Sequence, residues 1–188
     1  HGPRGWAAAL ATFVIVFVLV PIGTSAALDP EQYDLAMTKG LAHFKQERFE
    51  EAERFFREAL AAKSGDPEAS YHLGRTQIRL QRYGDAKDTF GSLLRSDPRS
   101  GRAYLGLGMA CYYEGRFHEA LTNLGQAESL LTSDPLVYFY QGLSYQKLGA
   151  YEDSIRPLTT AGRLAPDLAP EVRYLLGLAY YKQGFGDE

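Results

Sequence analysis

The chain of 188 residues has a single cysteine and no excess of basic side chains. One cysteine cannot form a disulfide within the chain. Lys and Arg number 20 against 23 Asp and Glu, which gives a formal net charge of -3. The sequence therefore lacks the basic surface that is typical of nucleic-acid-binding proteins, and we expect no nucleic-acid partner.

The residue spacings of metal and catalytic sites are also missing. Three histidines follow the N-terminal segment, His43, His72 and His118, and no His-x3-His or Cys-x2-Cys spacing occurs. Cys111 lies in an apolar, helix-periodic segment, where a small buried thiol is the expected role. The Gly-rich stretch 105–108 neither follows a strand nor opens a helix, so it is no phosphate loop. We expect no catalytic residue, metal site or cofactor, and no enzyme activity in this chain.

The N-terminal segment has the layout of an export signal. Arg4 precedes an uncharged run from Trp6 to Val20, and small residues follow at 25–27. Residues 1–27 are predicted to be a signal peptide or an N-terminal membrane anchor. Pro21 and Gly23 break the run and favour cleavage, but 24 uncharged residues suffice to span a bilayer, so both interpretations stay open. Either one predicts a periplasmic or cell-envelope location, with the chain touching the inner membrane only through this segment if it is uncleaved.

The most informative feature that is present is a repeat. Five glycines in apolar, helix-periodic segments are spaced by 34, 34, 34 and 35 residues: Gly40, Gly74, Gly108, Gly142 and Gly177. A glycine inside a helix costs roughly 1 kcal/mol relative to alanine, so its recurrence at one phase indicates close approach of helices. A period of 34 residues predicts stacked helix pairs, whose function lies on a binding surface.

Units that begin seven residues before each glycine divide the chain into four full repeats and a partial fifth. After a linker at 28–32, the repeat domain spans 33–188, with units at 33–66, 67–100, 101–134, 135–168 and 170–188. The glycine is position 8 of its unit. Position 15 is glycine in three units, at Gly115, Gly149 and Gly184, where a left-handed helix terminus suits glycine.

A second helix is predicted from position 17, which is aromatic in the four full units. The residues are Phe49, Tyr83, Phe117 and Tyr151. Small residues follow at position 20, where Ala52, Ala86, Ala120 and Ser154 lie, and bulky ones at position 24, where Phe56, Phe90, Leu124 and Leu158 lie. Small side chains at positions 8 and 20 let the two helices approach, and the bulky residue fills the groove beside them.

This pattern resembles the tetratricopeptide repeat family, and the match is best in the second and third units. It is carried by Leu73-Gly74, Ala86, Phe90 and Pro98 in one, and by Tyr104, Leu107-Gly108, Ala120 and Leu124 in the other. The resemblance implies an all-α fold, a right-handed α-solenoid of stacked antiparallel helix pairs. It also implies that positions 2, 5, 9, 12 and 13 of the first helices face a concave groove.

Reading those positions predicts an apolar, aromatic groove with a cationic edge. The groove residues are Met37, Leu41, Phe44, Lys45, Tyr71, Arg75, Ile78, Arg79, Leu105, Met109, Tyr112, Tyr113, Phe139, Leu143, Lys147, Tyr174, Leu178, Tyr181 and Lys182. Such a groove suits a peptide or helical segment with aromatic or aliphatic anchors and nearby acidic side chains.

The sequence therefore predicts a non-catalytic scaffold that binds a protein segment in the cell envelope, in assembly, secretion or polymer export. One alternative is that these residues form the N-terminal periplasmic arm of a larger protein, with an outer-membrane barrel or a catalytic domain after residue 188. A second alternative, an enzyme with its active site inside the chain, lacks any supporting motif.

Overall fold

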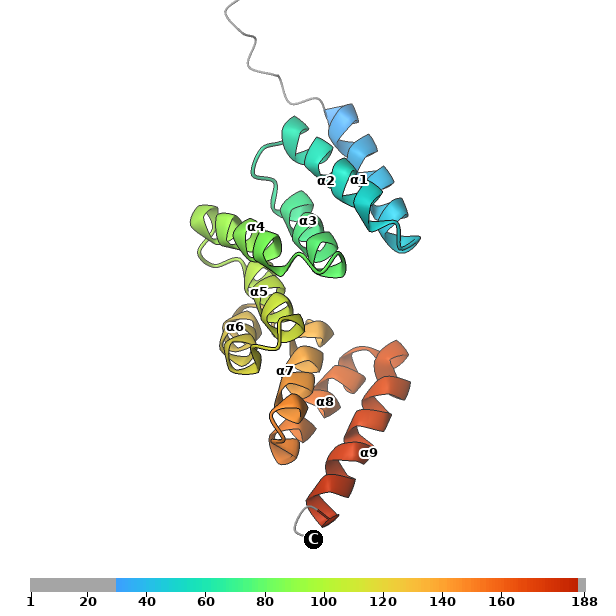
Figure 1. Cartoon of the computed structure of the whole chain (residues 1–188), viewed down its shortest axis with the longest axis vertical. Coiled ribbons are helices and arrows are strands. Elements are labelled where there is room, and N and C mark those ends of the chain that lie inside the picture. Colours follow the sequence, from blue (N-terminus) through green and yellow to red (C-terminus); the bar gives the residue numbers. More distant parts are fainter. Residues whose placement is uncertain (1–29, 186–188) are drawn as a thin grey trace, which may run out of the picture.

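The computed structural model describes residues 30–185, and this part of the chain is helical with no strand. Figure 1 shows the helices following one another along the long axis of the molecule. They are α1 (Pro30–Lys45), α2 (Phe49–Ala62), α3 (Pro67–Arg79), α4 (Tyr83–Ser96), α5 (Gly101–Tyr113), α6 (Phe117–Leu130), α7 (Pro135–Lys147), α8 (Tyr151–Leu164), a 3₁₀ turn (Pro166–Leu168) and α9 (Ala169–Phe185). The predicted signal peptide or anchor lies outside the described residues.

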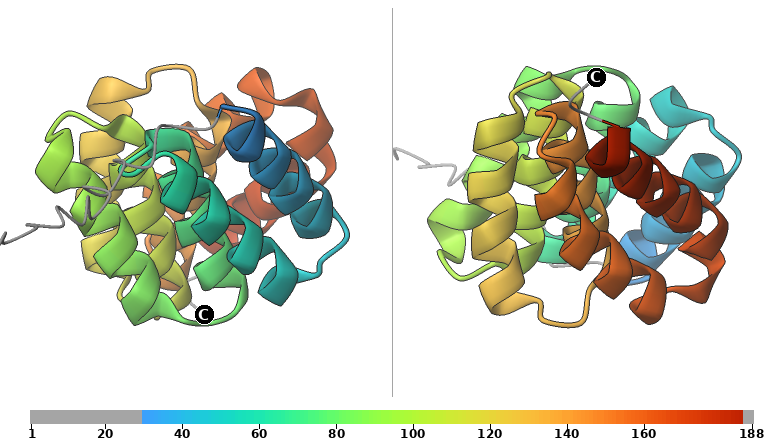
Figure 2. Two further views of the ribbon diagram at one scale, coloured as in Figure 1. Left: turned by 90° about the horizontal axis from the view of Figure 1, so that it is seen from above. Right: turned by 90° about the horizontal axis from the view of Figure 1, so that it is seen from below.

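Each helix packs against the next one along the chain. The first helices of successive pairs also touch: α1 contacts α3, α3 contacts α5, and α5 contacts α7. Four consecutive helix pairs followed by α9 thus form an α-solenoid, which confirms the predicted fold class. Seen along its length, the stack turns from one pair to the next (Figure 2). The solenoid therefore has one face formed by the first helices and another formed by the second helices.

The helix boundaries follow the capping residues of the sequence. The second helices begin at the aromatic of position 17, as predicted. Three first helices are capped by side chains, because Asp66, Ser100 and Asp134 accept backbone N–H groups at the starts of α3, α5 and α7. The predicted linker at 28–32 is wrong in part: α1 begins at Pro30, a residue suited to a first helical turn.

The repeated glycines of the four complete pairs meet the bulky residue of their own second helix. A Cβ placed on Gly40, Gly74, Gly108 or Gly142 would lie 2.4–2.6 Å from the nearest atom of Phe56, Phe90, Leu124 or Leu158, respectively. Those four bulky side chains are fully buried. The predicted interlock of positions 8 and 24 is confirmed, and it explains why the position tolerates no side chain.

Position 15 is left-handed in all four complete units, whether or not it is glycine. Gly115 and Gly149 have φ of 84° and 75°, and Glu47 and Gln81 have φ of 60° and 59°. The expectation for Gly184 is wrong, because α9 continues through it to Phe185. The turn is therefore dictated by the packing of each helix pair, and the first two units adopt it without the residue that suits it best.

Two contiguous apolar cores run through the stack. The smaller joins α1, α2 and the start of α3 around Phe56 and Leu73, and the larger runs from Tyr71 in α3 to Leu175 in α9. The two cores divide within α3, because one face of this helix belongs to the smaller core and another face to the larger core. Among the helices at 30–185, none combines the length and the apolar character that crossing a membrane requires.

Candidate functional site: the face of the first helices

The structure separates the nineteen predicted groove residues into three groups by burial. Six are buried: Met37, Tyr71, Ile78, Leu105, Met109 and Phe139. Five are half-buried: Phe44, Arg75, Tyr112, Leu143 and Leu178. Eight are exposed: Leu41, Lys45, Arg79, Tyr113, Lys147, Tyr174, Tyr181 and Lys182. For the six buried residues, the expectation of an open groove lining is wrong, since neighbouring first helices pack tightly enough to take these side chains into the core.

In the first two repeats, arginines of α3 cover the aromatic rings that a ligand would otherwise contact. The Arg75 guanidinium lies 5.1 Å from the ring centre of Phe44 and 5.5 Å from that of Tyr71. Arg79 lies 4.4 Å from the ring centre of Phe49 and pairs with Glu47 at 3.5 Å. Cation–π contacts of this kind hold the cations against the protein's own surface. The cationic edge at α3 is thus already engaged within the chain.

The middle of the face carries a cluster of tyrosines. The ring centre of Tyr112 lies 5.3 Å from Tyr113, 5.5 Å from Tyr140 and 5.8 Å from Phe117. The hydroxyl oxygens of Tyr113 and Tyr140 are 3.0 Å apart and share a hydrogen bond. Burial, followed by that hydrogen bond, raises the pKa of Tyr140. These edge-on contacts fix the Tyr112 ring in one orientation between α5 and α7.

Beside this cluster, four helices line a half-open cavity of about 400 Å³, which we call the α7–α9 cavity. Its lining comes from α5, α7, α8 and α9: Tyr112, Leu143, Gln146, Lys147, Tyr151, Leu175 and Leu178. Gln146 Nε2 donates a hydrogen bond to the backbone oxygen of Leu175 at 2.7 Å and ties α7 to α9. Four predicted groove residues are thus brought together at one site.

The surface of the α7–α9 cavity is polar and apolar in similar measure. Three leucines and the faces of two tyrosines offer contact area, and the exposed Lys147 adds a positive charge. Burial, then Tyr113 and Glu171, raises the pKa of Tyr112, so its hydroxyl stays protonated and can donate a hydrogen bond. Ligand pockets in general have volumes of about 300–1,000 Å³. The α7–α9 cavity lies near the lower end of this range, so it suits one or two side chains of a partner.

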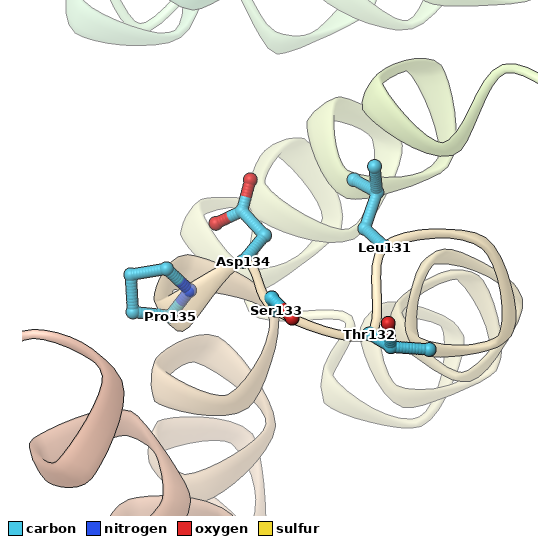
Figure 3. Close-up of a pocket in the computed structure, with 5 residues that line it drawn as sticks. All are labelled: Leu131, Thr132, Ser133, Asp134 and Pro135. Atoms are coloured by element: carbon cyan, nitrogen blue, oxygen red, sulfur yellow. The ribbon is translucent and has the colours of Figure 1, made fainter.

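A second cavity, of about 470 Å³, lies at the loop between α6 and α7. All its lining residues belong to the five-residue stretch from Leu131 to Pro135, and Figure 3 shows them strung along that loop. It lies at the opposite end of α7 from Gln146, roughly 16 Å away at about 1.5 Å rise per residue. Because one loop supplies every contact, we do not take it as the binding site. No group of three metal-ligating side chains occurs within residues 30–185.

Sequence reasoning missed two residues of the α7–α9 cavity, Tyr151 and Leu175, whereas Gln146 occupies position 12, which the repeat pattern assigns to the groove. Tyr151 belongs to the position-17 aromatics, two of which contact the position-12 ring of their own unit: Phe49 lies 5.5 Å from Phe44, and Phe117 lies 5.8 Å from Tyr112. The recurrence of an aromatic at position 17 was therefore a usable signal. Leu175 carried none, because its place in the wall depends on the angle between α7 and α9.

Comparison with known families agrees with this architecture. Two tetratricopeptide-repeat family models match the chain, one over residues 43–111 and the other over residues 5–67. Together they span more than half of the sequence, and the chain belongs to the tetratricopeptide repeat family. Domains of this family bind protein partners and are generally non-catalytic scaffolds. No curated protein matches the chain.

Solved structures with the same fold come from several bacterial proteins. A thermophilic TPR protein of Thermus thermophilus is 26% identical, with a TM-score of 0.71, and the match covers 81% of this chain and 83% of that one. A MamA protein is 25% identical with a TM-score of 0.63, covering 84% and 86%. PilF of Pseudomonas aeruginosa is 22% identical with a TM-score of 0.71, covering 82% and 70%, and it shows the fold alone.

Proposed function

We propose that this chain is a non-catalytic scaffold that captures a peptide or helical segment of a partner protein in the α7–α9 cavity. The observation that carries the proposal is the convergence of four helices on one cavity of about 400 Å³, whose lining combines three leucines with polar side chains. Among the predicted groove residues, those at this cavity remain accessible as a group, while six others are buried. Hydrophobic anchors that enter a pocket of this kind dominate the energy of protein recognition.

The proposed ligand carries an aromatic or branched aliphatic anchor with an acidic residue beside it. The anchor would contact Leu143, Leu175 and Leu178, and the Tyr112 hydroxyl would donate to a backbone or side-chain oxygen. Lys147 is exposed at the rim and would attract the acidic residue. A rim charge contributes mainly to the association rate and to specificity, so the anchor is expected to supply most of the affinity.

The proposal includes a location in the cell envelope, after export across the inner membrane. It is supported by the sequence layout of residues 1–27, in which an uncharged run follows Arg4. The test is protease treatment of intact cells, spheroplasts and lysates of a Gram-negative host that makes the chain. We expect digestion as soon as the outer membrane is opened. Protection until the inner membrane is lysed would contradict export, and the mass of the recovered chain would report cleavage.

The ligand chemistry is tested by selecting random peptides displayed on phage against the full chain. We expect enriched sequences with an aromatic or aliphatic residue next to Asp or Glu. Their binding should be lost in Tyr112→Ala and in Leu143→Ala. The matched control is Phe44→Ala, which removes the position-12 ring of the first repeat and should keep binding. Selected peptides that bind all three variants alike, or that are rich in basic residues, would contradict the proposal.

A further inference from the structure

Arg75 differs from the other arginines of residues 30–185 in its burial, since it is half-buried and all of them are exposed. Lys87 is the half-buried lysine of the same range, and its ammonium group pairs with Glu114 at 2.6 Å. Across this described part of the chain, the Arg75 guanidinium contacts the rings of Phe44 and Tyr71 but makes no ion pair with a carboxylate. Charged groups withdrawn from water are normally paired, so Arg75 has the capacity to bind an anion from outside the solenoid.

The two ring contacts hold Arg75 in place without using its hydrogen-bond donors. Cation–π contacts involve the flat face of a guanidinium, whose five N–H groups project from the edge in a fork that matches a carboxylate. Glu68, on the same helix, is already engaged, because it pairs with Arg102 of α5 and lies 3.2 Å from His72 Nε2. The edge of the Arg75 guanidinium therefore remains available for a carboxylate of a ligand.

The other charged groups near the Tyr71 ring have partners within the chain. Burial raises the pKa of Tyr71, while Arg75 and Arg102 lower it and Asp134 and Glu68 raise it, so these four charges surround one ring. Asp134 accepts a backbone N–H at the start of α7 at 2.9 Å, and Glu68 pairs with Arg102. Arg75 is thus the member of this group whose charge is not matched by a contact of its own.

A continuous line of side chains leads from Arg75 to the α7–α9 cavity. Arg75 lies close enough to Tyr140 to oppose the rise in pKa that burial and the Tyr113 hydrogen bond cause there. The Tyr140 ring lies 5.5 Å from that of Tyr112, which lines the cavity. Tyr113 is exposed, and because its hydroxyl and that of Tyr140 share one hydrogen bond, one O–H of the pair can still donate to a ligand.

The distance between the two sites sets the spacing of the groups that would bind them. Because helices in contact lie about 8–10 Å apart, the two steps from α3 over α5 to α7 cover about 16–20 Å. An extended chain spans this distance with about five or six residues, at about 3.3 Å each.

We propose that Arg75 binds the carboxylate of a second acidic residue of the captured segment, which crosses α5 in an extended conformation about five or six residues from its anchor. This proposal rests on the capture of that anchor in the α7–α9 cavity. It adds a specificity-determining arginine on α3 and a donor along the path, the hydroxyl pair of Tyr113 and Tyr140.

The experiment uses the full chain and fluorescent synthetic peptides in which serines separate one Phe from one Glu, in either order. At a separation of about five or six residues, we expect Glu to tighten binding about tenfold relative to Gln, because a charge-assisted hydrogen bond forms. In Arg75→Gln, the Glu and Gln peptides should bind alike. The Gln peptide should bind this variant like the unaltered chain, which shows that the fold is preserved.

The matched control is Arg79→Gln, one turn further along α3, because Arg79 already pairs with Glu47. It should keep the preference for Glu. A preference that survives Arg75→Gln, or that is the same at separations of two and ten residues, would overturn the assignment of Arg75. Peptides that bind Leu143→Ala as tightly as the unaltered chain would instead contradict capture in the α7–α9 cavity.

A second measurement tests Arg75 without any anchor. The arginine Nε–H signals of the full chain are followed by NMR during titration with acetylated tetraglutamate amide. We expect a larger shift at Arg75 than at the exposed Arg99 and Arg163. Equal shifts at the three arginines would overturn the proposal, whether or not the cavity binds an anchor.

Discussion

The same repeat positions play different roles in the first two repeats (α1 to α4) and in the last part of the stack (α5 to α9). In the first two, Arg75 lies over the rings of Phe44 and Tyr71, so these cationic and aromatic side chains are already engaged in cation–π contacts with each other. Further along, Leu143, Lys147 and Leu178 border a cavity instead. Repeat position thus determines which face a side chain occupies, and the neighbouring side chains determine whether that face is already filled.

The largest expected difference between the two regions is in ligand binding, tested at position 9 of the first and fifth units. Leu178→Asp puts a charge into the wall of the α7–α9 cavity and should weaken capture of a selected peptide by about 100-fold, in line with the loss of a central anchor contact. Leu41→Asp makes the same change on the exposed surface of α1 and should leave the dissociation constant within about twofold. Isothermal titration calorimetry measures both. Similar losses in the two variants would remove the distinction between the regions.

The next largest effect is on stability. Here the larger change is expected in the first two repeats, and the smaller one at the cavity. Arg75→Ala removes contacts with two aromatic rings and should lower the free energy of unfolding by about 1–2 kcal/mol. Lys147→Ala, at the rim of the cavity, should change it by less than about 0.5 kcal/mol. Urea denaturation followed by circular dichroism gives both values. A Lys147 variant as unstable as the Arg75 variant would show that this lysine is part of the packing.

A smaller effect is expected at position 15, where the first two units have non-glycine residues in a left-handed conformation. Gln81→Gly should raise the free energy of unfolding by about 1 kcal/mol, because it relieves the backbone strain at φ 59°. Gly149→Ala should lower it by about the same amount, since it introduces that strain at φ 75°. Thermal unfolding of the two variants gives the sign of each change. Equal signs would contradict the account of the turn.

The smallest effect is a pH dependence located in the first two repeats. Burial lowers the pKa of His72, where the ring stacks on Phe56 at 5.4 Å. The unfolded chain therefore takes up a proton near pH 6.5 that the folded chain resists, and stability should fall as the pH drops through this value. His72→Gln should flatten the decline in melting temperature between pH 7.5 and 5.5. His118→Gln, on the exposed surface of α6, is the control, and a flattening there instead would place the effect elsewhere.

The fold could be predicted from the sequence because it depends on residues that repeat. The glycine of position 8 and the bulky residue of position 24 specify the close approach of each pair, and the aromatic of position 17 marks where each second helix begins. These contacts are local to one unit, so 34-residue periodicity suffices to find them. The left-handed Glu47 and Gln81 escaped prediction because their conformation is imposed by packing and is not favoured by the residue.

The candidate site could be predicted only in part, since it depends on contacts between units. Periodicity found Tyr112, Leu143, Lys147 and Leu178 but not Leu175, whose place in the wall depends on how α9 sits against α7. Periodicity also included Leu105 and Met109, which neighbouring first helices bury. The tightness of inter-repeat packing varies along the stack with the size of the side chains involved, and no single-unit pattern contains that information.

The most direct test of ligand capture by the last repeats is methyl NMR of the full chain with labelled leucines, titrated with a selected peptide. We expect chemical-shift changes centred on Leu143, Leu175 and Leu178, with Leu35, Leu41 and Leu60 of the first repeat unchanged. Shifts concentrated on the first repeat, or spread evenly over all leucines, would contradict it.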